Sequence, residues 1–328
     1  MAQKIRWGVL GVAKIAVEKV IPAMQRGESS QVVAIASRDL GKAEAAATRL
    51  GIARAHGSYE ALLADPEVDA IYNPLPNHLH VPWSIRAAEA GKHVLCEKPI
   101  GLSVEETLQL IRARDANRVK IGEAFMARTH PQWLRVKELA ASGPIGELRV
   151  VSGYFSYFNR DAGNIRNKPE MGGGALMDIG CYPITLSRMV FGSEPLRVFG
   201  SLERDPEMQT DRLTSAILEY DHGQCTFTCS TQLVPFQTMH VLGTRGRIEV
   251  EIPFNAPPDR VTGILVNGAW EEFPAVDHYT LQGDLFSRAI LEGGEVPVPL
   301  EDALRNMAVI EAIFRSAEVG QAVSPARV

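Results

Sequence analysis

Two charged residues at the end of a short apolar run are the first in this chain that can do chemistry. Residues 93–96 read as a buried strand between Gly91 and Pro99, and this strand delivers Glu97 and Lys98 to its carboxyl end. Ligands of open α/β sheets bind at the carboxyl ends of the strands. A lysine held there can hydrogen-bond a substrate hydroxyl or shift the pKa of a neighbouring group. The pair is equally compatible with a salt bridge beside a loop proline.

A second pair of reactive side chains follows a run of three glycines, Gly172–Gly174. Residues 175–191 read as a helix, with a kink expected at Pro183. In a helix Asp178 and Tyr182 share a face, because they are four residues apart. The glycines offer bare backbone, which would let a bulky ligand touch the main chain. The alternative is an ordinary core tyrosine, with Asp178 near the positive end of the helix dipole.

The element that would position a cofactor lies at the N-terminus. An apolar strand at residues 5–10 runs into Gly11-Val12-Ala13-Lys14-Ile15-Ala16, a dinucleotide fingerprint with alanine in its middle position. Gly11 makes the tight turn, and the following helix N-terminus favours a pyrophosphate. The cofactor contacts expected from this loop are those of Gly11, Val12, Ala13, Lys14 and Ile15.

The end of the second strand bears on which cofactor binds. Residues 31–36 read as a strand, and Ser37 and Arg38 follow it. An acidic residue at this point favours NAD, whereas a hydroxyl and a guanidinium suit a 2′-phosphate. The residues therefore favour NADP(H) over NAD(H). The neighbouring Asp39, or a solvated Arg38, would leave NAD(H) open.

A proline-rich loop follows the strand at residues 68–73, and we expect further cofactor contacts from its residues Pro74, Leu75, Asn77 and His80. At the end of the next strand we expect cofactor contacts from Glu97 and Lys98. His78 and His80 have no third ligand in a suitable context, so we expect no metal. Helices at residues 41–50, 80–90 and 103–117 alternate with the strands. The alternation predicts an α/β fold with a doubly wound parallel sheet.

After about residue 124 the pattern changes to long strand-like runs, at residues 147–158 and several times between 195 and 273. The predicted domains are 1–124 for the cofactor, 125–300 for substrate and oligomerisation, and a helix in 301–328 that returns toward the first domain. Residues 225–232 alternate apolar side chains with threonine and serine, and the uncharged face favours an oligomer contact. We expect a homodimer or homotetramer.

Composition excludes several other classes. The net charge of −5 supplies no polybasic surface, so we expect no nucleic acid partner. No apolar run approaches the ~20 residues of a membrane span, and the N-terminus lacks a signal-peptide layout. The four cysteines have neither zinc nor disulfide spacing and are expected to be buried thiols. The expected compartment is the cytoplasm.

The N-terminal fingerprint, Glu97-Lys98-Pro99 and the glycine run with Asp178 and Tyr182 together resemble the glucose-fructose oxidoreductase / inositol dehydrogenase / rhizopine-catabolism (Gfo/Idh/MocA) family. The likeness spans nearly the whole chain. Its dimeric dihydrodiol dehydrogenases and D-xylose 1-dehydrogenases look nearest, because residues 164–166 (Asn-Ile-Arg) precede the glycine run. The resemblance implies a Rossmann domain, then an α/β domain with a large, mostly antiparallel open sheet that often forms a dimer interface. It also implies a cis bond between Lys98 and Pro99.

The resemblance further implies that Lys98, Asp178 and Tyr182 surround the nicotinamide. Many relatives carry histidine in place of Tyr182. We expect NADP⁺ to take the hydride and Tyr182 the hydroxyl proton. A free phenol has a pKa of ~10, which a cationic Lys98 would lower. Asp178 would hold substrate hydroxyls, and Arg166 is a further substrate contact.

The expected activity is NADP(H)-dependent hydride transfer at a hydroxyl carbon of a sugar or related polyol or diol. Two alternatives are a non-catalytic sugar or cofactor sensor and an NAD-dependent glycosidase of the same superfamily. The joint presence of Lys98 and Tyr182 argues against the sensor, and Ser37-Arg38 and Tyr182 argue against the glycosidase.

Overall fold

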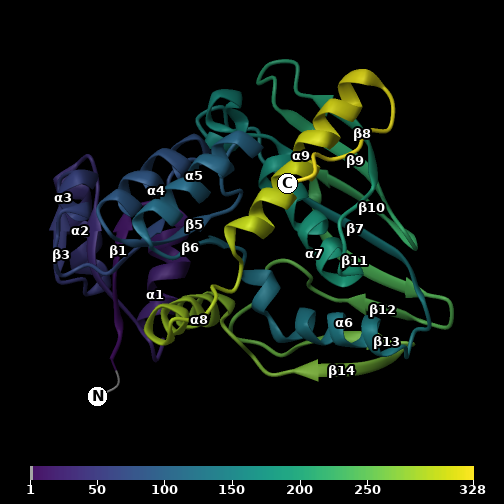
Figure 1. The fold of residues 1–328 in the computed structure, drawn as a ribbon, viewed down its shortest axis with the longest axis horizontal. Coiled ribbons are helices and arrows are strands. Elements are labelled where there is room, and N and C mark those ends of the chain that lie inside the picture. Colours follow the sequence, from purple (N-terminus) through teal and green to yellow (C-terminus); the bar gives the residue numbers. More distant parts are fainter. Residues whose placement is uncertain (1–2) are drawn as a thin grey trace. The chain divides into compact units, whose positions relative to one another are not determined.

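The computed structural model describes residues 3–328 and divides the chain into two compact units. The first unit comprises the described part of Met1–Thr129 together with Asp277–Ala303, and the second comprises His130–Val276 together with Leu304–Val328. Both units contain a sheet with helices, drawn in Figure 1. The expected α/β class, with a parallel sheet followed by a mostly antiparallel one, is confirmed.

The first unit is built on six parallel strands in the order β3-β2-β1-β4-β5-β6. Helices between successive strands make the crossovers that parallel strands require. The strands are β1 (Ile5–Leu10), β2 (Ser30–Ala36), β3 (Arg54–His56), β4 (Ala70–Asn73), β5 (His93–Glu97) and β6 (Ile121–Ala124). The helices are η1 (Ala16–Val20), α1 (Ile21–Gln25), α2 (Leu40–Leu50), α3 (Tyr59–Leu63), η2 (Asn77–Leu79), α4 (His80–Glu89), α5 (Val104–Asn117), η3 (Met126–Thr129) and α8 (His278–Glu292).

Helix α8 belongs to this first unit although it follows the second sheet in the chain. Trp7 of β1 is fully buried against Phe286, and their ring centroids lie 5.6 Å apart. The indole Nε1 of Trp7 donates to Ser287 Oγ at 3.0 Å, which satisfies the buried N–H of the tryptophan. The central strand of the parallel sheet is therefore covered by residues almost 280 positions later in the sequence.

The second unit is built on an eight-stranded sheet in the order β14-β13-β12-β11-β7-β10-β9-β8. Only the pair β7–β10 is parallel. The strands are β7 (Leu148–Phe158), β8 (Arg197–Arg204), β9 (Asp211–Tyr220), β10 (Gly223–Ser230), β11 (Gln232–Gly243), β12 (Arg247–Val250), β13 (Thr262–Val266) and β14 (Ala269–Phe273). The helices are α6 (Pro131–Ser142), η4 (Ile165–Asn167), η5 (Pro169–Met171), η6 (Leu176–Gly180), α7 (Cys181–Phe191) and α9 (Leu300–Val319).

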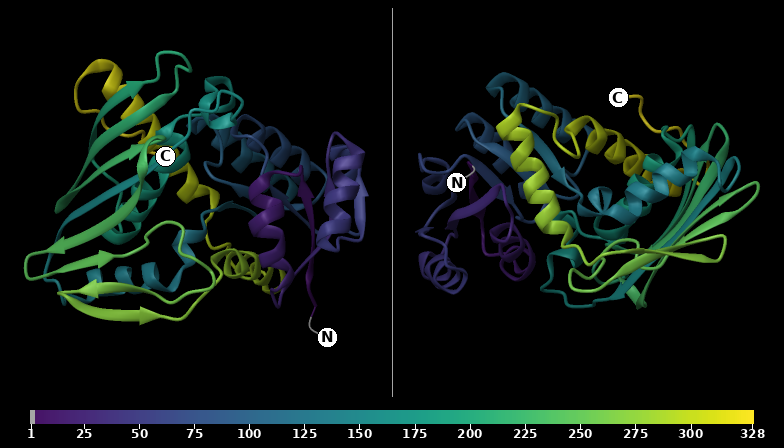
Figure 2. Two further views of the ribbon diagram at one scale, coloured as in Figure 1. Left: turned by 180° about the vertical axis from the view of Figure 1, so that it is seen from behind. Right: turned by 90° about the horizontal axis from the view of Figure 1, so that it is seen from below.

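One face of the eight-stranded sheet is packed and the other is open. Figure 2 shows α6 and α7 on the same side of the sheet. Gly180, the last residue of η6, lets the helix that continues as α7 lie close to β10. A Cβ at this position would lie only 2.9 Å from Cys229 Sγ, too close for a side chain. On the opposite face Phe158 is 64 % and Val234 75 % exposed. None of the described helices covers these two side chains.

The division of the chain differs from the expected one at two places. Residues 277–303 join the first unit, although we expected the second domain to extend to residue 300. Of the helical segment expected at residues 301–328, residues 301–303 group with the first unit and residues 304–328 with the second. Two contacts account for this: Gly200 of β8 donates its N–H to Ser316 Oγ at 3.0 Å, and Val198 pairs with Val323.

All four cysteines are buried free thiols, as predicted. Between residues 3 and 328 there is no helix with the length and apolar character needed to cross a membrane. The helical irregularity expected at Pro183 lies one turn earlier, where η6 is a π-helical segment.

Candidate cofactor-binding and catalytic residues

The four segments expected to bind the cofactor all lie in the first unit. They follow β1, β2, β4 and β5, which are consecutive neighbours in the order β2-β1-β4-β5. Because parallel strands have their carboxyl ends on one edge, the segments that begin at Gly11, Ser37, Pro74 and Lys98 share that edge. The edge includes the point where the chain returns from β3 to a place beside β1, and dinucleotides bind at such switch points.

The turn after β1 requires glycine. Gly11 has φ +81°, and its N–H donates to Ala36 O at 2.8 Å. A Cβ there would be strained by the backbone and would lie 3.1 Å from Leu75 Cδ2. Residues Val12–Ile15 keep exposed surface, whereas Ala16 is buried beneath them. The residues at the start of this helix therefore keep surface that an approaching anion can contact.

At the end of β2, Asp39 has a structural role that was not expected. Its Oδ1 accepts from the Lys42 N–H at 3.2 Å and caps α2, while its own N–H donates to Ser37 Oγ. Arg38 is exposed and lies beside the Tyr59 phenol. Burial raises the pKa of Tyr59, and Arg38 lowers it in part. The Asp39 carboxylate, the group that left binding of NAD(H) as an alternative, is thus hydrogen-bonded to the N-terminus of α2.

His80 has a different place from the one we expected. Its side chain is 1 % exposed, and both ring nitrogens lie 2.7 Å from backbone carbonyl oxygens, Nδ1 from Pro99 and Nε2 from Leu75. Burial lowers the pKa of the imidazole to about 4, to which Lys98 and His78 add, so the ring is neutral at pH 7. We expected the His80 side chain to contact the cofactor. In the structure it instead contacts two loops of the protein, at Leu75 and Pro99. Asn77 begins η2 and is partly exposed.

The segment that carries Lys98 is held on both sides by buried groups. Tyr72 donates its hydroxyl to Glu97 Oε1 at 2.5 Å, and burial together with Glu97 raises the pKa of Tyr72 well above its ordinary value. After Lys98, the Ile100 N–H donates to Glu123 Oε1 at 2.8 Å. The bond between Lys98 and Pro99 is cis, as the resemblance implied. Lys98 itself is partly exposed at the carboxyl edge of the sheet.

In the second unit, Asp178 accepts hydrogen bonds from two polar side chains. Its Oδ2 accepts from the Tyr157 hydroxyl at 2.6 Å and from Arg166 Nε at 2.9 Å. The Arg166 side chain is 43 % exposed and that of Asp178 12 %. Asp178, with smaller contributions from Tyr157 and Tyr182, raises the pKa of Arg166. The carboxylate therefore has a fixed orientation and a cation beside it.

Tyr182 lies on the same helical segment within an aromatic cluster. Its ring centroid is 5.6 Å from that of Phe155 and 5.5 Å from that of Phe254, and the residue is 5 % exposed. These rings pack against the ring of Tyr182, while its phenol lies near enough to Arg166 to raise the pKa of the guanidinium. Tyr157, which we did not single out, belongs to the site because it points inward from β7, two residues beyond Phe155.

Two of the three glycines, Gly173 and Gly174, are explained by contacts with the chain itself. A Cβ on Gly173 would lie 2.4 Å from Arg166 O, and one on Gly174 would lie 1.9 Å from Asp211 Oδ1. The N–H of Gly174 also donates to Arg166 O at 2.8 Å. The chain's own atoms fill the space, and this replaces the ligand contact that we expected at this backbone.

Asp211 at the start of β9 anchors this region and was missed by the sequence analysis. It is 1 % exposed, and its Oδ2 accepts from the Leu176 N–H at 2.7 Å and from Thr214 Oγ1 at 2.8 Å. Burial raises the pKa of its carboxyl to about 6. Asp211 thus caps the helical segment that carries Asp178 and Tyr182, a role that Ala175 at the N-cap position does not fill.

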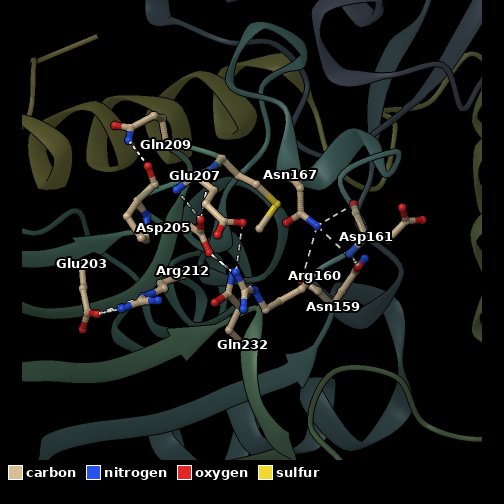
Figure 3. Close-up of polar contacts among 12 residues, drawn as sticks. Asn159, Arg160, Asp161, Asn167, Glu203, Asp205, Glu207, Gln209, Arg212 and Gln232 are labelled. Carbon is tan, nitrogen blue, oxygen red and sulfur yellow. Dashed lines mark hydrogen bonds and ion pairs between the residues drawn. The ribbon is translucent and has the colours of Figure 1, made fainter.

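The first part of the loop after β7 is held by a polar network, shown in Figure 3. The buried Asn167 donates from Nδ2 to Asp161 O at 2.9 Å. Gln232 of β11 donates to Asp205 Oδ2 at 2.7 Å, and Arg160 approaches the same oxygen at 3.9 Å. The network therefore joins residues 159–161 to Asn167, the neighbour of the Arg166 that reaches Asp178.

Two protein-family models match the chain. The model described as an oxidoreductase family with an NAD-binding Rossmann fold matches residues 5–125, and that of the GFO/IDH/MocA C-terminal domain matches residues 133–249. The chain belongs to the Gfo/Idh/MocA oxidoreductase family. The predicted family and the predicted NAD(P)-dependent enzyme class are thereby confirmed.

Individual relatives match almost end to end. An uncharacterized oxidoreductase from Rhizobium meliloti is 51 % identical over 96 % of this chain and 98 % of its own length. The D-xylose 1-dehydrogenase (NADP(+)) 2 of Haloferax volcanii is 41 % identical over 97 % and 98 %. Among solved structures, the 3-ketoreductase KijD10 from Actinomadura kijaniata, in complex with NADP and TDP-benzene, superimposes with a TM-score of 0.90 at 30 % identity, over 96 % and 98 % of the two chains.

Proposed function

We propose that this member of the family is an NADP(H)-dependent dehydrogenase that acts on a hydroxyl carbon of a sugar or a related polyol or diol. The observation that carries the proposal is the cluster on η6 and α7, where Asp178 is oriented by Tyr157 and Arg166 and shares a helical segment with Tyr182. Hydroxyl-rich substrates need such fixed acceptors and donors for orientation.

The residues of the first unit fit a dinucleotide. Gly11 leaves no side chain at the turn, and the segments after four neighbouring strands share one edge. NADP, when bound, supplies or accepts the hydride. In the proposed mechanism Tyr182 holds or releases the hydroxyl proton, Lys98 supplies the positive charge that favours its phenolate, and Asp178 orients the substrate hydroxyls.

The preference for NADP over NAD is supported by the contacts at the end of β2. Asp39 is bound to the N-terminus of α2, which leaves the Ser37 hydroxyl and the exposed Arg38 as the groups at this strand end. A guanidinium is the group best suited to a phosphate monoester. The Haloferax relative carries NADP(+) in its name, which agrees with this preference.

The open face of the eight-stranded sheet supports the proposed homodimer or homotetramer. Tyr154, Phe158, Val234 and Phe236 are all exposed there, and the neighbouring Thr228 and Ser215 add no charge. An exposed apolar patch of this kind marks an interaction surface. Light scattering on the purified protein would test it. We also propose a cytoplasmic location, in keeping with four free thiols.

A spectrophotometric screen at 340 nm, with NADP⁺ and NAD⁺ against aldoses, inositols and dihydrodiols, tests the proposed function. We expect reduction of NADP⁺ in preference to NAD⁺ with at least one substrate. Reduction of keto sugars by NADPH would show the reverse direction, for which the likeness to a 3-ketoreductase gives a reason. Tight NADPH binding without turnover would indicate a sensor, and glycoside hydrolysis without net absorbance change a glycosidase.

A further inference from the structure

We propose that His80 is a positioning residue that ties the loop beside the glycine turn to the segment that carries Lys98. The inference rests on the proposed function and deepens it. It is drawn entirely within the first unit. One imidazole bridges two loops that follow neighbouring strands, β4 and β5.

First, the His80 ring is fully enclosed and both of its nitrogens face backbone carbonyl groups, so it cannot contact a ligand. The side chain is 1 % exposed, and each ring nitrogen lies 2.7 Å from a carbonyl oxygen. Its backbone is fixed as well, because the fully buried Asn73 donates from Nδ2 to His80 O at 3.0 Å and to Ser84 Oγ at 3.1 Å. A buried residue with this set of contacts orients its neighbours and does not meet a ligand.

The second step concerns what the two carbonyl groups belong to. Leu75 packs on the glycine turn, since its Cδ2 lies 3.1 Å from the position of a Cβ on Gly11. Pro99 directly follows Lys98. Glu123 holds the next N–H, that of Ile100, from the other side at 2.8 Å. His80 therefore connects the turn where a pyrophosphate is expected with the lysine expected to act on the substrate.

The third step is the proton count. A neutral imidazole has one N–H and can hydrogen-bond only one of the two carbonyl groups. When that N–H goes to Pro99 O, the tie to the loop after β4 is made by the His80 backbone, whose carbonyl accepts from Asn73 Nδ2. Burial keeps the ring neutral at pH 7, with a pKa of about 4. Glutamine can supply the same single donation through its amide, whereas leucine can supply none. Glutamine should therefore restore part of what leucine loses.

Loss of the His80 contacts should lower the rate because it misplaces the two loops that carry the cofactor and Lys98. Without the bridge the two loops are free to shift independently, and a displacement of ~1 Å at a reacting group can cost about 10²-fold in rate. We expect His80→Leu to lower kcat by roughly that factor and to weaken NADPH binding, while KM for the substrate changes little. His80→Gln should lie between His80→Leu and the wild type in both respects.

The test compares wild type, His80→Leu, His80→Gln and a matched control, His93→Gln. His93 is a partly buried histidine at the opposite end of β5, where its Nδ1 accepts from the Lys120 N–H at 2.8 Å. Fluorescence titration with NADPH gives the affinity, the substrate identified at 340 nm gives kcat and KM, and thermal melting gives the folded fraction. His93→Gln should leave both the affinity and kcat unchanged.

Wild-type NADPH affinity and wild-type kcat in His80→Leu would overturn the inference. Losses that only follow the unfolded fraction, without partial rescue by glutamine, would also overturn it. If His80→Leu does not fold, His80→Met, which likewise donates no hydrogen bond, takes its place, and wild-type affinity and kcat in that variant exclude the bridge. If the wild type turns over no substrate, the proposed function fails, and the NADPH titrations still test the bridge.

Discussion

Replacing Gly174 by alanine should destabilise the second unit more than the same replacement at a glycine that has only a positive φ. Gly174 has φ +118°, and a Cβ on it would lie 1.9 Å from Asp211 Oδ1 and 3.0 Å from Asp211 Cγ. The Asp211 side chain cannot simply turn away. Its other oxygen accepts from the Leu176 N–H and from Thr214 Oγ1, so a shift breaks the buried cap of η6.

The magnitude combines two costs. A positive φ in a residue with a Cβ costs roughly 1–2 kcal/mol. Forcing an extra carbon into a packed site costs typically about 1–3 kcal/mol. Since both apply at Gly174, we expect Gly174→Ala to lose about 2–5 kcal/mol of stability.

Gly192 provides the matched control. It ends α7 with φ +66°, and no atom lies within 4 Å of the position of its Cβ. Gly192→Ala should therefore show the backbone cost alone, about 1–2 kcal/mol. Urea denaturation of the wild type and the two variants measures the difference. Equal losses in the two variants, or wild-type stability of Gly174→Ala, would refute the explanation of the glycine run.

Three further predictions concern the site. Tyr182→Phe should lower the rate by ~10²–10⁴ if the phenol is the acid–base group, and a loss below threefold in steady-state assays would move that role to Lys98. Arg38→Ala should raise KM for NADP⁺ much more than KM for NAD⁺, and equal changes would remove Arg38 from the 2′-phosphate site. Burial raises the pKa of Asp211 from 3.8 to about 6, so the protonated form favours the folded state. The contribution of Asp211 to stability is therefore present below pH 4 and is lost as the pH rises through 6; Asp211→Asn should lack this decline in urea denaturation at pH 4 to 7, and identical pH profiles would contradict it.

Local patterns identified the segments of the cofactor edge. The strand, turn and helix around Gly11 and the strand end at Lys98 are both recognisable because each is set by neighbouring residues. The sheet order that aligns them follows from alternating strands and helices. The role of Asp39 as a cap was also readable, since an aspartate three residues before Lys42 at a helix start is a capping signal.

The contacts that the sequence did not disclose join residues far apart in the chain. Asp211 lies 35 residues beyond the Leu176 N–H that it caps, so the residues around the glycine run do not disclose which atoms pack against it. His80 reaches a carbonyl 19 residues away. The sequence predicted a helix in residues 301–328, yet Ser316 contacts Gly200 of β8, which lies 116 residues away in the chain. Such pairings depend on tertiary packing, which no local spacing rule contains.

Lys98→Met tests the central claim most directly. The methionine keeps the length and the apolar stem of the side chain and removes the charge. We predict that the variant largely retains NADPH binding in fluorescence titrations and shows no hydride transfer at 340 nm with the substrate that the wild type oxidises. Turnover comparable with that of the wild type would contradict the account.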